Sequence, residues 1–145
     1  MKALIQRVTS ASVQINGETV GSIDKGLLLF LGVEKGDDSA CALKLLDKVL
    51  RYRVFSDESG KMNLSLKDIS GELLIISQFT LVADTRKGLR PSFSKAGSPD
   101  ESRALYEYFI QEAGKSGLRI QAGQFGADMN VGLQNDGPVT FMLEV

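Results

Sequence analysis

The sequence predicts an α+β fold, a single domain over residues 1–145 in which a mostly antiparallel β-sheet or barrel carries two helices. Three observations indicate this architecture. The chain has 145 residues, of which 43% are hydrophobic, and this is enough for the core of one ordinary domain. Several segments show the patterns of β-strands. Two other segments show the spacing and the start signals of α-helices.

The first three strands follow one another closely. Residues 3–15 alternate polar and apolar side chains as a long half-buried strand does, and Asn16-Gly17 is a strong signal for a hairpin turn into the segment ETVGSI. Residues 27–33, LLLFLGV, are apolar without alternation. This pattern is typical of a strand buried on both faces, so we expect it at the centre of the sheet.

Two helices are predicted. Asp37 and Asp38 can cap a helix that runs to about residue 52 and buries one face. Residues 98–101, Ser-Pro-Asp-Glu, form a capping box with proline at the first helical position, and we expect this second helix to reach about residue 113. The expected buried positions are Ala42, Leu45, Leu46, Val49 and Leu50 in the first helix and Ala104, Leu105, Tyr108 and Phe109 in the second.

The remaining strands complete the sheet. The segment VFSDESGKMNLSL predicts a hairpin centred on residues 58–60, and residues 72–82, ELLIISQFTLV, predict a second strongly apolar strand. Further strands are expected near residues 118–121, 129–134 and 139–145. Gly137-Pro138 precedes the last of them, a position where proline is tolerated although it donates no ladder hydrogen bond. Because cis X-Pro bonds are uncommon in folded proteins, the residues alone predict a trans bond there.

The composition excludes several classes of function. The chain has no histidine, which removes Ser-His-Asp and Cys-His triads, His-ligated zinc and the commonest general base near neutral pH. The net charge of −1 gives no general argument for binding nucleic acid or membranes, so any RNA contact has to be local. A single cysteine, Cys41, fits a reducing compartment, and no signal peptide or membrane span is apparent. We therefore expect a cytoplasmic protein.

Three stretches can carry chemistry. The 72–82 strand has polar side chains on both faces only at its end, in the letters SQFT, which either form a site or merely satisfy hydrogen bonds. The loop DTRKGLRPSFSK, residues 84–95, is basic and suits a phosphate-bearing ligand, unless its charges are only solvated. The glycine-rich segment GQFGADMNVG, residues 123–132, either stacks a base or bends a strand. No ligand cluster for a metal is visible, and we expect no cofactor.

The segments SQFTL (residues 77–81) and NDGPVT (residues 135–140) resemble motifs of the D-aminoacyl-tRNA deacylases, also called D-tyrosyl-tRNA(Tyr) deacylases. Five further segments, INGETVGSI, GLLLFLGV, SGKMNLS, ADTRKGLRPSF and GQFGADM, fall in the order that this family has, so the resemblance covers nearly the whole chain. It implies a hydrolase of translation quality control, which removes D-amino acids from mischarged tRNA.

The resemblance also implies a homodimer with active sites at the interface. Gly137 and Pro138 of one subunit, joined by a cis bond, would reach into the pocket of the other subunit, and Arg7 would steady them. This element would leave no room for an L side chain, so chirality would be selected by steric rejection. Glycine has no side chain and would pass, which makes glycyl-tRNA mischarged on tRNA(Ala) a second expected substrate.

Catalytic roles are implied for Ser77, Gln78, Phe79 and Thr80. The N–H groups of Phe79 and Thr80 are candidate donors to the carbonyl oxygen of the ester. The proton can be handled by a ribose hydroxyl of the substrate or by Thr80. We favour the ribose hydroxyl because Thr80 has no evident base partner to activate it.

Binding roles are implied for two further groups of residues. Phe125 and Met129 would line the pocket for the terminal adenosine of the tRNA, and Arg86, Lys87 and Arg90 would contact the tRNA. Two other functions remain open. One is a non-catalytic tRNA-binding or proofreading-partner module of the same fold, and the other is a dimeric scaffold or small-molecule binder in which these motifs are ordinary strand ends.

Overall fold

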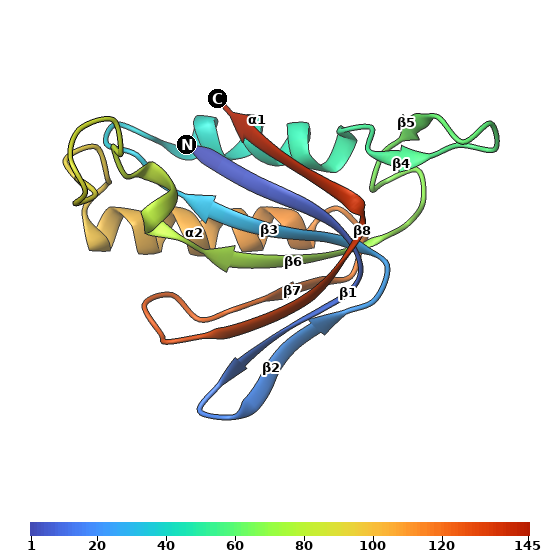
Figure 1. Ribbon diagram of the computed structural model, residues 1–145, viewed down its shortest axis with the longest axis horizontal. Helices are drawn as coiled ribbons and strands as arrows, with labels where there is room; N and C mark the ends of the chain where they lie inside the picture. Colours follow the sequence, from blue (N-terminus) through green and yellow to red (C-terminus); the bar gives the residue numbers. More distant parts are fainter.

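A curved six-stranded sheet carries the fold in the computed structural model, which describes residues 1–145 (Figure 1). Its strands are β1 (Lys2–Ile15), β2 (Glu18–Ile23), β3 (Gly26–Gly32), β6 (Glu72–Ser77), β7 (Ile120–Ala122) and β8 (Asn130–Glu144). The order is β2-β1-β3-β6-β7, with β8 on the other edge of β1. β1 is antiparallel to β2, β3 and β8, whereas the β3–β6 and β6–β7 pairs are parallel. The predicted mostly antiparallel sheet with two helices is therefore confirmed.

The length of β1 closes the sheet almost into a barrel. Its first half, residues 2–8, pairs with β3, its second half, residues 11–15, pairs with β2, and β8 follows it along both halves. Figure 1 shows β1 crossing the sheet and bending away together with β2 and β8. The Asn16-Gly17 hairpin between β1 and β2 is present as predicted, with a positive φ at both residues.

Both helices begin at the predicted caps. In α1 (Ser39–Arg51) the side chain of Asp38 accepts a hydrogen bond of 2.8 Å from the N–H of Cys41. In α2 (Pro99–Gly114) Ser98 and Glu101 form the complete capping box. The predicted hairpin after α1 is also present, as β4 (Phe55–Ser56) and β5 (Met62–Leu64), but it is a separate two-stranded sheet that projects from the body. No helix of the structure is both long and apolar enough to cross a membrane.

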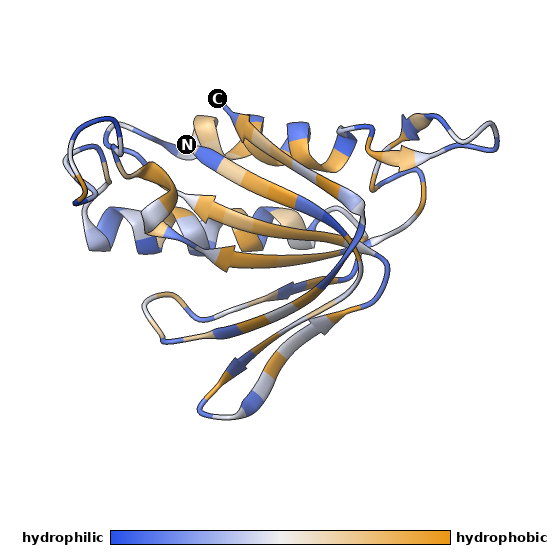
Figure 2. Ribbon diagram, in the orientation of Figure 1, coloured by the Kyte–Doolittle hydropathy of each residue, from blue (hydrophilic) through white to orange (hydrophobic).

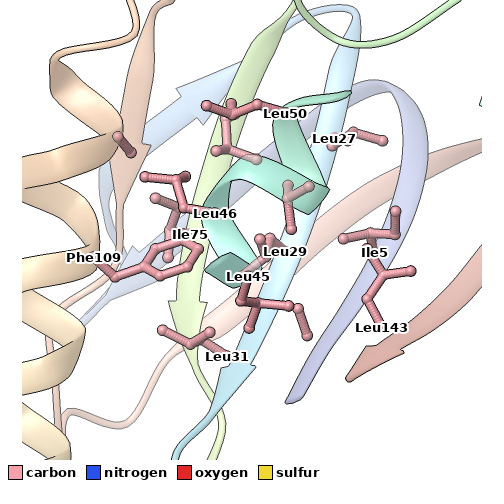
Figure 3. Packing of buried hydrophobic residues seen from close by; sticks show 14 of the residues in the cluster. Ile5, Leu27, Leu29, Leu31, Leu45, Leu46, Leu50, Ile75, Phe109 and Leu143 are labelled. Atoms are coloured by element: carbon pink, nitrogen blue, oxygen red, sulfur yellow. The ribbon is translucent and has the colours of Figure 1, made fainter. Parts of the chain in front are cut away.

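The core lies on both faces of the two central strands. α1 and α2 cover one face, where 21 buried residues cluster around side chains such as Leu29, Ile75 and Phe109 (Figure 3). A smaller cluster of seven residues, including Leu28 and Leu74, fills the inside of the curl on the other face. Burial on both faces explains why β3 and β6 lack alternation, and Figure 2 shows them as the most continuously hydrophobic strands.

The buried face of α2 differs from the predicted one. Phe109 is buried as expected, but Ala104 is exposed and Leu105 and Tyr108 are only partly buried. The buried positions are Ser102, Tyr106, Phe109 and Ala113. The helix is turned in this way because the Tyr106 hydroxyl points into the sheet, where it lies 2.9 Å from the carbonyl oxygen of Ile75.

The predicted strand over residues 72–82 is too long. β6 ends at Ser77, and a 3-10 helix, η1 (Phe79–Val82), follows. Ser77 is the last β6 residue with a partner, Leu31, because β3 itself ends at Gly32. Without a neighbouring ladder, the N–H groups of Leu81 and Ala83 donate to the carbonyls of Gln78 and Thr80 instead. The expected alternation of side chains beyond Ser77 is therefore wrong.

The two strands predicted at the C-terminus are one strand. β8 runs through Gly137-Pro138, but its pairing with β1 shifts there. Gln6 faces Thr140 and Val8 faces Asn135, so residues 136–139 stand opposite Arg7 alone. Proline is accommodated because these four residues bulge out of the ladder and need no partner there.

Candidate active site

A pocket of about 520 Å³ opens where the end of β6, η1, the start of α2 and the loop between β7 and β8 meet. Figure 1 shows these segments gathered at one end of the sheet. Five residues named from the sequence line this pocket together: Ser77, Gln78, Phe79, Phe125 and Met129. They come from two segments that are separated by more than forty residues in the sequence, and the parallel pairing of β6 with β7 brings these segments side by side.

Tyr106 lines the pocket and is tied by its hydroxyl to the backbone of β6 and of Gly123. The Tyr106 hydroxyl lies 2.8 Å from the carbonyl oxygen of Gly123 as well as close to that of Ile75, and the N–H of Gly123 donates to Ile75 at 3.0 Å. Burial raises the pKa of Tyr106, so this hydroxyl stays protonated and serves as a fixed donor. A Cβ atom at Gly123 would lie 2.5 Å from Met129 Sδ, so a larger residue there would displace the Met129 side chain.

Phe125 is in contact with two side chains of α2. Its ring centroid lies 6.0 Å from that of Tyr106, and the guanidinium carbon of Arg103 stands 5.1 Å from it. The ring therefore forms a stable flat wall of the pocket. A wall of this kind can stack a nucleobase, since every base offers a π-face.

The turn after β6 places backbone donors beside the pocket. The N–H of Gln78 donates a hydrogen bond of 2.8 Å to the carbonyl oxygen of Leu31 and is not free. Phe79 and Thr80 are the first residues of η1, so their N–H groups have no acceptor within their own helix. The Gln78 side-chain amide donates to the Thr80 hydroxyl at 2.5 Å. Thr80 is exposed and is not among the residues that line the pocket.

The basic loop is anchored next to the pocket but does not line it. The backbones of Asp84 and Ser92 form hydrogen bonds with each other at the base of the loop. The centroid of the Phe93 ring lies 5.0 Å from that of the Phe79 ring. Arg86 is turned back onto Asp84, where Nε and Oδ1 are 2.9 Å apart, and its guanidinium lowers the pKa of that carboxyl. Lys87 and Arg90, which are exposed and form no ion pair, are therefore the free cations of the predicted tRNA-binding group.

Gly137 and Pro138 lie on the bulge of β8 and do not line the pocket of their own chain. The bond between them is cis, as the resemblance implies and contrary to what the residues alone predict. Both residues are exposed. Arg7 supports the bulge, because its Nε donates to the carbonyl of Asp136 at 2.9 Å and its Nη1 to that of Val54 at 2.7 Å. The Asn135 side chain closes it by accepting from the N–H of Val139 at 2.7 Å.

Comparison with known proteins shows the family to which the chain belongs. A sequence model of the D-Tyr-tRNA(Tyr) deacylase family matches residues 4–144. The chain belongs to this family of hydrolases. Two similar relatives, both named D-aminoacyl-tRNA deacylase, come from Actinobacillus pleuropneumoniae serotype 5b (strain L20), with 62% identity over 145 residues, and Haemophilus influenzae (strain PittEE), with 63% identity over 146 residues. Each comparison covers 100% of both chains.

A similar solved structure is that of a protein named c-Myc DNA Unwinding Element Binding Protein. It is 41% identical, with a TM-score of 0.94, over 100% of this chain and 99% of the other. The two proteins therefore have the same fold over the whole length of this deacylase family member.

The structure of this deacylase family member also brings in residues that the sequence did not single out. Tyr106, Ser102 and Asp128 line the pocket, and Arg103 stands beside it. Nothing in the helical spacing of α2 marked Ser102 or Tyr106 as pocket residues, because both occur in an ordinary amphipathic pattern. Asp128 lay within the glycine-rich stretch and could have been named. No three His, Cys, Asp or Glu side chains lie close enough together to hold a metal ion.

Proposed function

We propose that this chain hydrolyses the ester bond of D-aminoacyl-tRNA and releases the free D-amino acid and the tRNA. The observation that carries this proposal is the single pocket shared by Ser77, Gln78, Phe79, Phe125 and Met129, in a chain whose relatives are named D-aminoacyl-tRNA deacylase. The terminal adenosine stacks on the Phe125 wall beside Met129. This places the ester, one ribose away, next to the turn after β6.

The reaction needs little from side chains. The oxygen of a water molecule attacks the ester carbonyl carbon, the bond from that carbon to the ribose oxygen breaks, and the ribose oxygen leaves with a proton. The N–H groups of Phe79 and Thr80 donate to the carbonyl oxygen as its negative charge develops. Each such donor contributes roughly 2.7–4 kcal/mol to stabilising the transition state. Orientation of the bound ester lowers the barrier further.

A ribose hydroxyl of the substrate handles the proton. The chain has no histidine, and the Thr80 hydroxyl is engaged by the amide of Gln78, which is no base. Thr80 therefore lacks the general base that a threonine nucleophile requires. Gln78 and Thr80 instead hold each other and fix the turn that carries the two N–H donors.

Thr80→Ala and Ser77→Ala should each keep substantial deacylase activity, within about tenfold of wild type, because losing one neutral hydrogen bond costs about 1 kcal/mol. The measurement is the single-turnover rate on D-Tyr-tRNA, with circular dichroism to check the fold. A folded Thr80→Ala protein that loses about 10⁴-fold or more would instead identify Thr80 as a nucleophile.

A second copy of the chain completes the active site. The Gly137-Pro138 bulge is exposed and does not line the pocket of its own chain, and β8 has a strand neighbour on one side only. The same strand exposes Leu133, Phe141 and Met142. An exposed edge with apolar side chains favours association, and a two-fold dimer would let each bulge reach the pocket of the partner.

The bulge acts as a wall against L side chains. Arg7 and Asn135 brace its backbone through the hydrogen bonds that they make, so it cannot move aside easily. Favourable contacts discriminate a methylene by only about 1–3 kcal/mol, whereas a clash with a rigid wall costs more. A D side chain points away from the wall. Glycine presents nothing to it, so glycyl-tRNA mischarged on tRNA(Ala) is a second substrate.

Deacylation time courses on D-Tyr-tRNA, L-Tyr-tRNA and Gly-tRNA(Ala) test this selectivity. We expect wild-type protein to hydrolyse the D and glycyl esters and to leave the L ester at its spontaneous rate. Spontaneous hydrolysis of each ester, measured without protein, is the control. If Gly-tRNA(Ala) resists hydrolysis as strongly as L-Tyr-tRNA does, the steric account is wrong, even where D-Tyr-tRNA is cleaved.

The second candidate function is binding of nucleic acid without hydrolysis. The solved structure that is 41% identical favours it, since the name of that protein says that it binds a DNA element. The exposed cations Lys87 and Arg90 suit any phosphate backbone. This candidate predicts that tRNA is retained in a filter assay while D-Tyr-tRNA remains intact, and hydrolysis by wild-type protein excludes it.

A further inference from the structure

Arg103 is an exposed cation beside the pocket that neither the residues nor the family resemblance assigned. It lies on α2 between Ser102 and Tyr106, which both line the pocket. Its guanidinium carbon stands 5.1 Å from the centroid of the Phe125 ring, and a Cβ atom added to Gly126 would be 4.0 Å from its Nη2. The side chain thus crosses from the helix to the outer wall of the pocket.

Arg103 has no carboxylate partner within the chain. Asp100 and Glu107 are one helical turn away on either side, but Arg103 takes part in none of the ion pairs of the structure. The pocket lining itself contains one carboxylate, Asp128, and no lysine or arginine. A polyanionic substrate therefore finds a free cation at the rim of a pocket that holds none.

We propose that Arg103 binds the phosphate that joins the terminal adenosine to the rest of the tRNA. This inference rests on the proposed function, in which adenosine stacks on Phe125. The phosphate is then one ribose away from the stacked base, within reach of a long side chain anchored on the same ring. The π-face of Phe125 holds the guanidinium in place, and its planar fork of N–H groups is suited to phosphate oxygens. Arg103 is thus a positioning residue for the 3′ end.

The test compares two substrates that differ in this phosphate. D-Tyr-tRNA carries it, and the ester 2′(3′)-O-D-tyrosyl-adenosine does not. For Arg103→Ala we expect kcat/KM on D-Tyr-tRNA to fall about tenfold, through KM, because a hydrogen bond to a charged partner contributes in this range. On D-tyrosyl-adenosine we expect kcat/KM to equal that of wild type. Arg103→Lys should recover part of the loss on tRNA, since it keeps the charge without the fork.

Salt dependence gives an independent readout. A plot of log kcat/KM for D-Tyr-tRNA against log salt concentration should be shallower by about 0.7 in Arg103→Ala, the contribution of one phosphate contact on a single strand. Arg51→Ala is the matched control, because Arg51 is also an exposed arginine on a helix, and it is paired with Asp47. This variant should match wild type on both substrates and in its salt dependence.

Two results would overturn the assignment. An equal loss on both substrates would show that Arg103 only supports the Phe125 ring. Unchanged kinetics of Arg103→Ala on D-Tyr-tRNA would show that Arg103 neither binds the phosphate nor supports the ring. Failure of the proposed function is distinguishable from both, since wild-type protein would then hydrolyse neither substrate.

Discussion

Gly137→Val should lower the rate of D-Tyr-tRNA hydrolysis by about 100-fold or more, since a displacement of about 1 Å in a positioned group can cost that much. A Cβ atom at Gly137 would lie 2.7 Å from Val139 Cγ2 and 3.2 Å from Arg7 Nη2, and the φ angle of +143° is one that L side chains rarely adopt. The bulge therefore has to change shape, and in the proposed dimer a bulge of another shape would no longer fit the pocket of the partner subunit. Single-turnover deacylation measures the effect.

A glycine elsewhere on the same strand separates this effect from general damage to β8. A Cβ atom at Gly132 would have only the Ser12 Oγ atom near it, at 3.5 Å, and the φ angle of Gly132 is not in the region that favours glycine. Gly132→Val should therefore keep wild-type activity. Thermal melts of both variants check the fold. A folded Gly137→Val protein with wild-type activity would contradict the role of the bulge.

Mixed dimers decide whether the bulge acts on its own chain or on its partner. Ala127 lines the pocket, and Ala127→Trp should fill it and inactivate that pocket alone. When Ala127→Trp and Gly137→Val chains are unfolded and refolded together at equal amounts, about a quarter of wild-type activity should return, because half of the dimers are mixed and each holds one intact site. A bulge that served its own chain would leave every dimer inactive.

Phe109→Ala should lower the free energy of unfolding by about 3–5 kcal/mol, the range observed when a buried phenylalanine is truncated in a core. Phe109 is 0% exposed and lies between α2 and the sheet, near Leu46, Leu29 and Ile75 (Figure 3). Strands and helices on all sides restrict relaxation, so most of the cavity should persist. Urea denaturation of wild type and variant at the same protein concentration measures the loss.

Leu43→Ala is the control for this core substitution. Leu43 lies on the outer face of α1 and is 43% exposed. Its truncation should change the free energy of unfolding by less than about 0.5 kcal/mol. If Phe109→Ala loses no more than this control, then the contact between α2 and the sheet contributes much less to stability than its burial indicates.

Local signals predicted most of the elements. The Asn16-Gly17 hairpin and the caps at Asp38 and Ser98 are where the sequence places them, because each depends on neighbours within a few residues. The central position of β3 was predicted for a similar reason, and the run in β6 was predicted as a second strongly apolar strand. An uninterrupted apolar run has no polar face to present to water, so only a place between two covered faces suits it.

The ends of elements were predicted less well. The strand predicted through Val82 stops at Ser77, because β3 ends beside it. A strand is stabilised by its neighbour, and the letters SQFTL do not say where that neighbour ends. The same holds for β8, where Gly137-Pro138 was expected at the start of a strand and instead forms a bulge within one, since β1 continues to pair on both sides of it.

The sequence by itself determined the class of fold, the exclusion of histidine chemistry and, through its motifs, the family to which the chain belongs. Tertiary structure alone decided that Ser77 and Phe125 share one pocket, that Thr80 stands outside it and that Arg103 stands at its rim. The physical reason is that composition and short-range pattern are carried by each segment, whereas a pocket is made by segments distant in the chain. Their relative positions follow only from the pairing of β6 with β7 and from the direction in which Tyr106 turns α2.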